Sequence, residues 1–423
     1  MEVDETVRLL QSLGDDQARP PMVDLNLAIR AGRKRQHRRR LATTGGSVLA
    51  VVAVIAAAPA AIHAVQQKEP AGVGVAASPK TGTTSAPVAA SPSTPAGPTS
   101  LSCVESLLPV PKAGQEGLVT GADPSGRFIV GRVYTGGHPT QAAIWDGGRL
   151  TTVTIPGSDA EFSDITSEGV AVGESFVSND ASTAWIYADG HLSKLAGPDG
   201  SSAVAIGEQG TIAGTENTKD ATTYPIVWHS ATSTAVRLPL TADTVGGQVE
   251  DVDSDGTIVG TLQQRSAQPL PGGPLTRGVV WRPDGSVDLL PLPTDLVDGV
   301  NGLEIHSIRN GVITAAATVS DKTSKSFTPV TYDLSTREFT LLPQANLWVG
   351  AGNAKGYIAG QTGSTPAVYT PTTGVIDLPT LRRVDGPIAL GRLATTISDN
   401  GLVIGGQDTD GNNVIRAVTW TCH

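Results

Sequence analysis

This chain of 423 residues is poor in the residue types from which most catalytic and metal-binding motifs are built. It has only two cysteines and seven histidines, and neither Cys-x-x-Cys nor His-Glu-x-x-His occurs. That absence excludes the common zinc sites and thiol redox motifs. A Gly-x-Ser-x-Gly elbow and a Walker loop are also missing, which argues against α/β-hydrolases and P-loop nucleotidases. The sequence therefore predicts no catalytic residue, no cofactor and no metal site.

What the chain does contain is a sevenfold repeat between Gly117 and Cys422. Each copy has a turn ending in Gly, an apolar segment, an aromatic residue and a Leu- or Val-rich segment. The seven aromatics are Trp145, Tyr187, Trp228, Trp281, Tyr332, Tyr369 and Trp420. A proline follows each of the first six, at Pro156, Pro198, Pro239, Pro291, Pro343 and Pro379. A period of about 40–50 residues made of four short β segments is typical of a propeller blade. We therefore predict an all-β fold, a seven-bladed β-propeller over residues 102–423.

The last copy is incomplete, and its missing part is found at the other end of the repeat region. Only three residues follow Trp420, so the seventh copy lacks its fourth strand. Residues 102–109 end in the same Leu-Leu-Pro as residues 289–291 of the fourth copy. Because an open ring would leave unpaired strand edges, we expect the N-terminal strand to complete the last blade. The only two cysteines, Cys103 and Cys422, lie on the two strands that this closure would pair, which predicts a disulfide. In the loop-entropy model such a bond stabilises the fold by at least about 4–5 kcal/mol. Two unrelated buried thiols are the alternative.

Glycine recurs at the end of the second predicted strand of most copies. We expect it to give room to the facing aromatic or to allow a bend. The positions are Gly131, Gly173, Gly214, Gly260, Gly360 and Gly405, with Ala315 in the fifth copy.

The first hundred residues divide into three further segments. Residues 1–40 are polar and end in a basic run of seven Lys and Arg between Arg30 and Arg40. Residues 41–65 contain an apolar stretch just long enough to cross a bilayer as one helix. The positive flank predicts a cytoplasmic N-terminus, a single-pass cell-membrane protein and an extracytoplasmic propeller. A cleaved signal peptide is the alternative, but a polar region of forty residues is long for one. Residues 66–101 are rich in Ala, Pro, Ser, Thr and Gly, which predicts a disordered stalk.

Charge limits the partners of the propeller. From Cys103 onward there are 33 acidic residues against 19 Lys and Arg, a formal balance of −14. This balance opposes nucleic acid as a partner. Two cysteines outside the membrane also fit an oxidising compartment. We expect a monomer that contacts the membrane through its single helix.

One repeat resembles a known family. The segment Asp251 to Gly260, DVDSDGTIVG, followed by Val279-Val280-Trp281 and Leu289, resembles the extracellular HAF-type repeat of bacterial proteins. The order of tail, Ala/Val-rich span and Pro/Ser/Thr stalk is similar to that of actinobacterial single-pass membrane proteins, some of which accompany extracytoplasmic-function sigma factors. The resemblance implies a β-propeller without catalytic residues.

Two groups of residues resemble metal ligands, but we interpret neither as a metal site. Asp251, Asp253 and Asp255 before Gly256 match the opening of a calcium loop, but the twelfth position is Leu262 where a Glu is needed. The histidines of the propeller occupy different positions in different copies, which is typical of loop residues. They are His138, His191, His229, His306 and His423.

In a four-stranded meander, successive loops emerge alternately at the two ends of the ring. The loops between strands two and three, and those leading to the next blade, emerge at one end, and these are the long and variable loops. The Gly-ended turns lie at the other end, where the stalk enters at Cys103. Long loops on a rigid scaffold are common recognition sites. Five arginines fall in them and are the predicted ligand-binding residues: Arg265, Arg277, Arg382, Arg383 and Arg392.

These observations favour a membrane-anchored extracytoplasmic binding or interaction propeller, the sensing part of a signalling protein being one form of it. Its partner would be an anionic protein or glycan on the outer face. Solvated arginines on uninvolved loops are the alternative reading of that face. A secreted-side hydrolase or lyase with a site in the channel is the alternative function.

Overall fold

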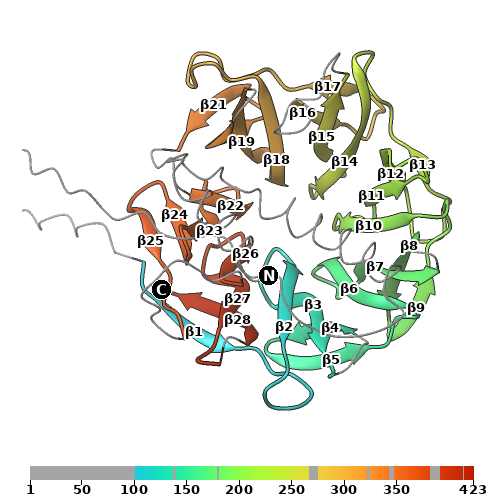
Figure 1. The fold of residues 1–423 in the computed structure, drawn as a ribbon, viewed down its shortest axis with the longest axis vertical. Coiled ribbons are helices and arrows are strands. Elements are labelled where there is room, and N and C mark those ends of the chain that lie inside the picture. The colour runs from blue at the N-terminus through green and yellow to red at the C-terminus, as the bar shows by residue number, and fades with distance from the viewer. Residues whose placement is uncertain are drawn as a thin grey trace, which may run out of the picture. The chain divides into compact units, whose positions relative to one another are not determined.

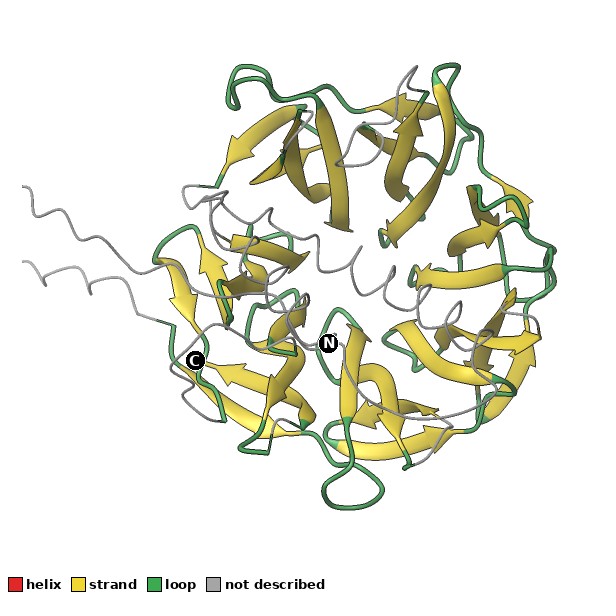
Figure 2. Ribbon diagram, viewed as in Figure 1, coloured by secondary structure: helices red, strands yellow, loops and turns green. Residues whose placement is uncertain are grey.

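The computed structural model describes residues 101–136, 140–178, 181–265, 275–321, 324–342, 347–381, 391–412 and 414–423. Residues 1–100 lie outside these ranges, and with them the predicted tail, span and nearly all of the predicted stalk. No helix within the described ranges combines the length and apolarity needed to cross a bilayer. The described residues form an all-β, seven-bladed propeller, as the repeat predicts (Figures 1 and 2).

Each blade is a four-stranded antiparallel sheet. In blades 1 to 6 the first strand along the chain lies nearest the centre and the fourth lies outermost (Figure 1). Blade 1 consists of β2 (Gly117–Ala122), β3 (Phe128–Tyr134), β4 (Thr140–Asp146) and β5 (Arg149–Val153). Blade 2 consists of β6 (Ser158–Ile165), β7 (Ala171–Ser178), β8 (Ala181–Ala188) and β9 (His191–Lys194). Blade 3 consists of β10 (Ser201–Ile206), β11 (Ile212–Asn217), β12 (Thr223–Trp228) and β13 (Val236–Arg237). Blade 4 consists of β14 (Thr244–Val252), β15 (Ile258–Gln264), β16 (Thr276–Trp281) and β17 (Val287–Leu289).

The remaining blades follow the same plan until the ring closes. Blade 5 consists of β18 (Gly302–Arg309), β19 (Val312–Ser320), β20 (Lys325–Asp333) and β21 (Glu338–Leu341). Blade 6 consists of β22 (Leu347–Gly352), β23 (Ile358–Thr362), β24 (Thr365–Thr370) and β25 (Gly374–Asp377). Blade 7 takes β26 (Leu393–Ile397), β27 (Val403–Thr409) and β28 (Ile415–Cys422) from the C-terminus, and β1 (Cys103–Leu107) as its outer strand.

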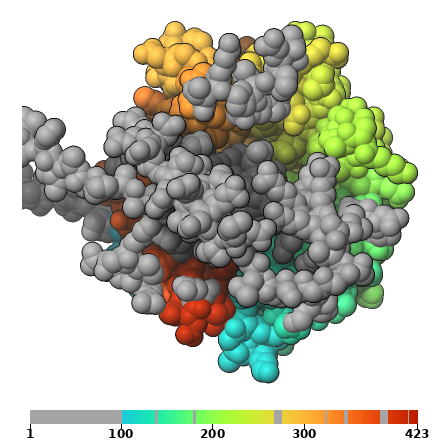
Figure 3. All heavy atoms as spheres, in the orientation of Figure 1, coloured from blue at the N-terminus to red at the C-terminus, as the bar shows by residue number. Residues whose placement is uncertain are grey.

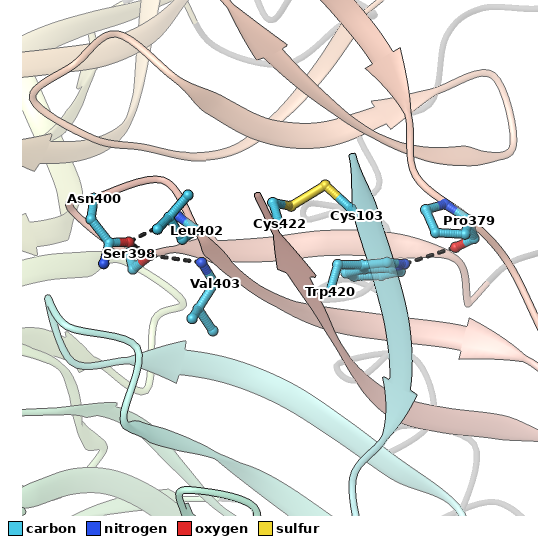
Figure 4. The surroundings of a disulfide bond; sticks show 8 residues. All are labelled: Cys103, Pro379, Ser398, Asn400, Leu402, Val403, Trp420 and Cys422. Atoms are coloured by element: carbon cyan, nitrogen blue, oxygen red, sulfur yellow. Dashed lines mark hydrogen bonds between the residues drawn. A yellow bond between two sulfur atoms is a disulfide. The ribbon is translucent and has the colours of Figure 1, made fainter. Parts of the chain in front are cut away.

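The predicted closure and disulfide are both confirmed. β1 pairs antiparallel with β28, and Cys103 lies opposite Cys422. The two sulfurs are bonded, across a separation of 319 residues in sequence (Figure 4). Beyond the disulfide, Ser102 and His423 exchange two backbone hydrogen bonds of 3.0 and 2.9 Å. Every edge that the truncated seventh repeat would have left open is therefore paired.

A β-bulge occurs at the same place in the innermost strand of all seven blades. The skipped residues are Thr120, Ser163, Val204, Glu250, His306, Gly350 and Thr395. A bulge bends its strand and sharpens the local twist. Its partner strand must pass close by, which explains the recurrent glycine. A Cβ at Gly260 would lie 2.3 Å from the Gln248 carbonyl oxygen and 2.9 Å from the Trp281 ring. In blade 7 the equivalent residue is Gly406, not the predicted Gly405, since only a Cβ at Gly406 would meet both backbone and Trp420 at such distances.

The tryptophans among the repeat aromatics tie their blades to the preceding ones. The indole N–H of Trp145 donates to the Pro109 carbonyl at 2.8 Å, and that of Trp281 donates to Pro239 at 2.9 Å. Trp420 donates to Pro379 at 2.7 Å (Figure 4). These rings are at most 2% exposed. Each of these three prolines, which follow the outer strand of a blade, thus accepts an interblade hydrogen bond from a buried indole.

Candidate functional site

The predicted cationic face is only partly formed by the described residues. Arg265 is exposed at the start of the long loop that follows β15. Arg277, across the same loop, is partly buried, and its guanidinium donates to the Leu290 carbonyl at 3.0 Å. Arg382 and Arg383 lie outside the described residues. Arg265 thus lies at the start of the loop and Arg277 on strand β16 beyond it, whereas the third described arginine of the set lies elsewhere.

Arg392 is an interior residue. Its side chain is 5% exposed and forms an ion pair of 2.7 Å with Asp408, whose side chain is fully buried. Asp408 also accepts a hydrogen bond from the backbone N–H of Leu381 at 2.6 Å. Glu105, on the closing strand β1, completes the cluster. Burial, and then the nearby Asp408 carboxylate, raise the pKa of Glu105 to about 8. The cluster therefore anchors β1 inside blade 7 and offers no exposed cation to a ligand.

A second charged cluster lies at the short-turn end of the ring, around Arg309 of blade 5. Its guanidinium lies 3.2 Å from a carboxylate oxygen of Asp251 in blade 4. Asp251, with Asp164, Asp399 and Asp253 in smaller measure, raises the pKa of Arg309. Arg309 therefore compensates acidic residues that three repeats bring to one place, a convergence that no individual repeat signals in the sequence.

These carboxylates are engaged in joining blades. Asp164 accepts a hydrogen bond from the Ile206 N–H of the next blade at 2.9 Å, and Asp251 accepts one from Ile308 at 2.9 Å. Asp253 receives the N–H groups of Asn310 and Gly311 at 2.9 and 2.7 Å. The acidic turn that opens like a calcium loop is thus a blade junction. No group of three or more potential metal ligands occurs among the described residues.

The space left among these groups is very small. A cavity of about 30 Å³ is lined by Asp164, Asp253, Arg309 and Asp399, among others. That volume accommodates one or two water molecules. Desolvation raises the pKa of Asp164 to about 7, so near neutrality its carboxyl group can hold or release a proton. A perturbed acid can mark an active site, but this cavity has no room for a sugar ring or an ester.

A larger hollow opens on the outer wall, between blades 4 and 5. It measures about 270 Å³ and runs beside β17, between Arg282, Leu290 and Pro291 on one side and Tyr332 and Arg337 on the other. Val280, Leu289, Leu334 and Asp288 complete its lining. We call it the 4/5 groove. The atoms of blades 4 and 5, in yellow and orange, form the upper rim of the molecule in Figure 3.

Sequence reasoning missed the 4/5 groove, although a signal for it is present. The repeat aromatic of blade 5 is Tyr332, whereas blade 4 has Trp281 at the equivalent position. A tyrosine is smaller and carries no indole N–H for the proline carbonyl of the preceding blade. The exchange was visible in the sequence, but its meaning depends on the tryptophan–proline hydrogen bond.

Comparisons with known proteins find only distant structural likeness. No family model matches the chain, and no curated protein matches it. Similar solved structures include the β-propeller domain of the Trilobed protease from Pyrococcus furiosus, at 13% identity and a TM-score of 0.47, covering 72% of this chain and 95% of that one. TolB from Acinetobacter baumannii matches at 13% identity and a TM-score of 0.37, over 70% and 80% of the two chains. The extracellular domain of a hybrid two-component system from B. thetaiotaomicron matches at 10% identity and a TM-score of 0.42, over 74% of this chain and 39% of that one. All three TM-scores lie below 0.5, so the propeller assignment rests on the strands and sheets described above.

Proposed function

We propose that this chain is a membrane-anchored extracytoplasmic propeller that binds a partner and does not transform a substrate. The observation that carries the proposal is how the described charged residues are used. At the channel mouth, Asp164, Asp251 and Arg309 are engaged in blade junctions around a cavity of about 30 Å³. The hollow of about 270 Å³ lies on the outer wall, where a partner can reach it.

Anchoring rests on the sequence before residue 100. Seven basic residues precede the apolar stretch, and the propeller follows it. The disulfide of the ring fits an oxidising compartment. In this arrangement the tail of residues 1–40 faces the cytoplasm, and a sensing role would couple partner binding outside to that tail.

Topology can be tested with introduced cysteines, because both native cysteines are bonded to each other. Ser12→Cys places a thiol in the tail, and Ser286→Cys places one on an exposed turn of blade 4. In intact cells a membrane-impermeant maleimide should label only the Ser286→Cys variant, and both should react after permeabilisation. Labelling of Ser12→Cys in intact cells would contradict the proposed orientation.

The alternative, a hydrolase or lyase acting in the channel, is separated from binding by a direct assay. The full-length protein is incubated with panels of polysaccharides and esters. Turnover of any of these substrates would favour the enzyme. No turnover, together with a photo-crosslinked partner on the propeller in intact cells, would favour binding.

A further inference from the structure

Most blade junctions in this propeller are filled by the ring of a tryptophan. Trp145, Trp281 and Trp420 each donate to the proline carbonyl that ends the outer strand of the preceding blade. The Trp228 indole donates instead to the carbonyl of Ala196, two residues before Pro198, at 2.6 Å. In blade 2, which has Tyr187 at this position, the link is made indirectly. There, the Trp185 indole donates to the Ser175 hydroxyl, and that hydroxyl donates to the Pro156 carbonyl.

The junction between blades 4 and 5 has no such ring. Tyr332 occupies the tryptophan position, and the 4/5 groove is lined by Tyr332 together with Leu290 and Pro291. In the other junctions an indole at the position of Tyr332 is bonded to the proline that corresponds to Pro291. The corresponding junction of blade 6 involves Pro343, which lies outside the described residues. The groove is thus a tryptophan site from which the chain's own tryptophan is missing.

The groove has the size and lining to receive an aromatic ring. An apolar cavity of about 150 Å³ is enough to bind benzene, and the groove measures about 270 Å³. Val280, Leu290 and Leu334 supply apolar contacts. Tyr332 is 5% exposed and packs against Phe339 with the rings tilted and their centroids 4.6 Å apart, which fixes the inner wall.

The rim of the groove is cationic on a propeller that is otherwise acidic. Arg282 is paired with Asp288 at 3.1 Å. Arg337 is exposed, and its side chain forms no ion pair within the described part of the chain. Its backbone has a φ of +60°, a left-handed conformation that costs a non-glycine residue free energy and is often retained at functional sites. A carboxylate next to the bound ring would therefore find a partner in Arg337.

The ring must come from another molecule. All 17 aromatic residues of the chain lie between Phe128 and Trp420, so residues 1–100 supply none. A second copy does not supply one either. Four of the tryptophans are at most 2% exposed, and Trp185 and Trp348 are partly buried within their sheets.

We propose that the 4/5 groove binds a tryptophan side chain of a partner protein, next to an acidic residue that pairs with Arg337. The inference rests on the proposed binding function and names its surface and the chemistry of its partner. The partner's indole takes the place that Trp281 and Trp420 occupy in their own junctions, with its N–H directed to the Pro291 carbonyl.

The test is a titration of the purified full-length protein with the peptide N-acetyl-Asp-Trp-Asp-amide carrying 5-fluorotryptophan, followed by ¹⁹F NMR. We expect saturable binding that is lost when alanine replaces the tryptophan. Tyr332→Trp should abolish binding and raise the melting temperature, because the chain's own indole then fills the groove. Tyr369→Trp, the same exchange in blade 6, should leave binding unchanged.

Charge is tested in the same assay. Arg337→Glu should weaken binding about tenfold, while Arg127→Glu, which reverses an exposed arginine of blade 1, should not. The proposal is overturned if the parent does not bind the peptide, or if Tyr332→Trp or Arg337→Glu binds it as the parent does. Cysteine labelling and photo-crosslinking are independent of this groove, so failure here leaves the proposed function to its own test.

Discussion

Asp251 of blade 4 links two neighbouring blades by accepting the Ile308 N–H and the Arg309 guanidinium of blade 5. Both partners follow the bulge in β18, and Asp251 itself follows the bulge in β14. The bulge thus directs a buried carboxylate at the next blade. Burial raises the pKa of Asp251, so Arg309 is what compensates its charge.

Replacing Arg309 should therefore destabilise the ring strongly. Removing one partner of a buried ion pair costs about 3–5 kcal/mol, because the other charge stays buried. We expect Arg309→Gln to lower the free energy of unfolding by about that amount at pH 8, measured by urea denaturation. The loss should be smaller at pH 5, where the carboxyl groups can protonate. Arg127→Gln, which breaks the exposed pair with Asp146, should leave the unfolding curve unchanged.

The interblade indole bonds should each contribute measurably. Trp281→Phe removes the indole N–H that donates to the Pro239 carbonyl. The loss of one intramolecular hydrogen bond costs about 0.5–1.5 kcal/mol, and the lost ring volume adds to this. Differential scanning calorimetry should show a lower melting temperature. Tyr369→Phe, where no indole is present, should melt close to the parent.

Glu105 should make stability depend on pH. Its pKa in the folded state is about 8, against 4.5 for an ordinary glutamate. The folded state therefore holds a proton that the unfolded state releases. The stabilisation is complete below pH 4.5 and is lost as the pH rises through 8. Glu105→Gln removes the ionisation and keeps a donor for Asp408, so it should be more stable than the parent above pH 8, on the order of 1–2 kcal/mol after allowance for solvent screening. The assignment would be contradicted if the stability of the parent and that of Glu105→Gln changed with pH in the same way. Glu338→Gln, at an exposed site of β21, is the control.

The disulfide should account for a large share of stability. Cys103 and Cys422 have a sequence separation of 319, for which the loop-entropy model gives about 6 kcal/mol. The double variant Cys103→Ser, Cys422→Ser should unfold at clearly lower urea concentration than the oxidised parent. A reduced parent should match the double variant, and two free thiols in the untreated protein would exclude the bond.

The sequence predicted the repeat architecture well because the strands and turns of each blade are determined by residues within one repeat. In blade 4 the four short β segments expected of each copy are the strands β14, β15, β16 and β17. The inner strand β14 begins at Thr244 and continues through a second irregularity at Val245. Closure was predictable because the two incomplete ends complement each other.

The sites were less predictable because they arise between repeats. Asp164, Asp253 and Arg309 come from three blades, and only the closed ring brings them to one cavity. Arg392 reads in sequence like the other loop arginines, yet its pairing with Asp408 places it inside blade 7. The 4/5 groove exists because Tyr332 does not fill the space that a tryptophan occupies in other junctions. Such information lies in the packing of neighbours and not in any single motif.

The position of the disulfide decides how the ring responds to mechanical force. The chain enters β1 at Cys103, so tension on the preceding segment would pull this strand away from β28 from that end. Peeling a strand from its end breaks hydrogen bonds one after another, each at low force. The covalent bond lies at the first pair of the ladder, Cys103 with Cys422. Tension is thus passed directly to β28 in the middle of blade 7, and the outer strand is relieved of load while the bond is intact.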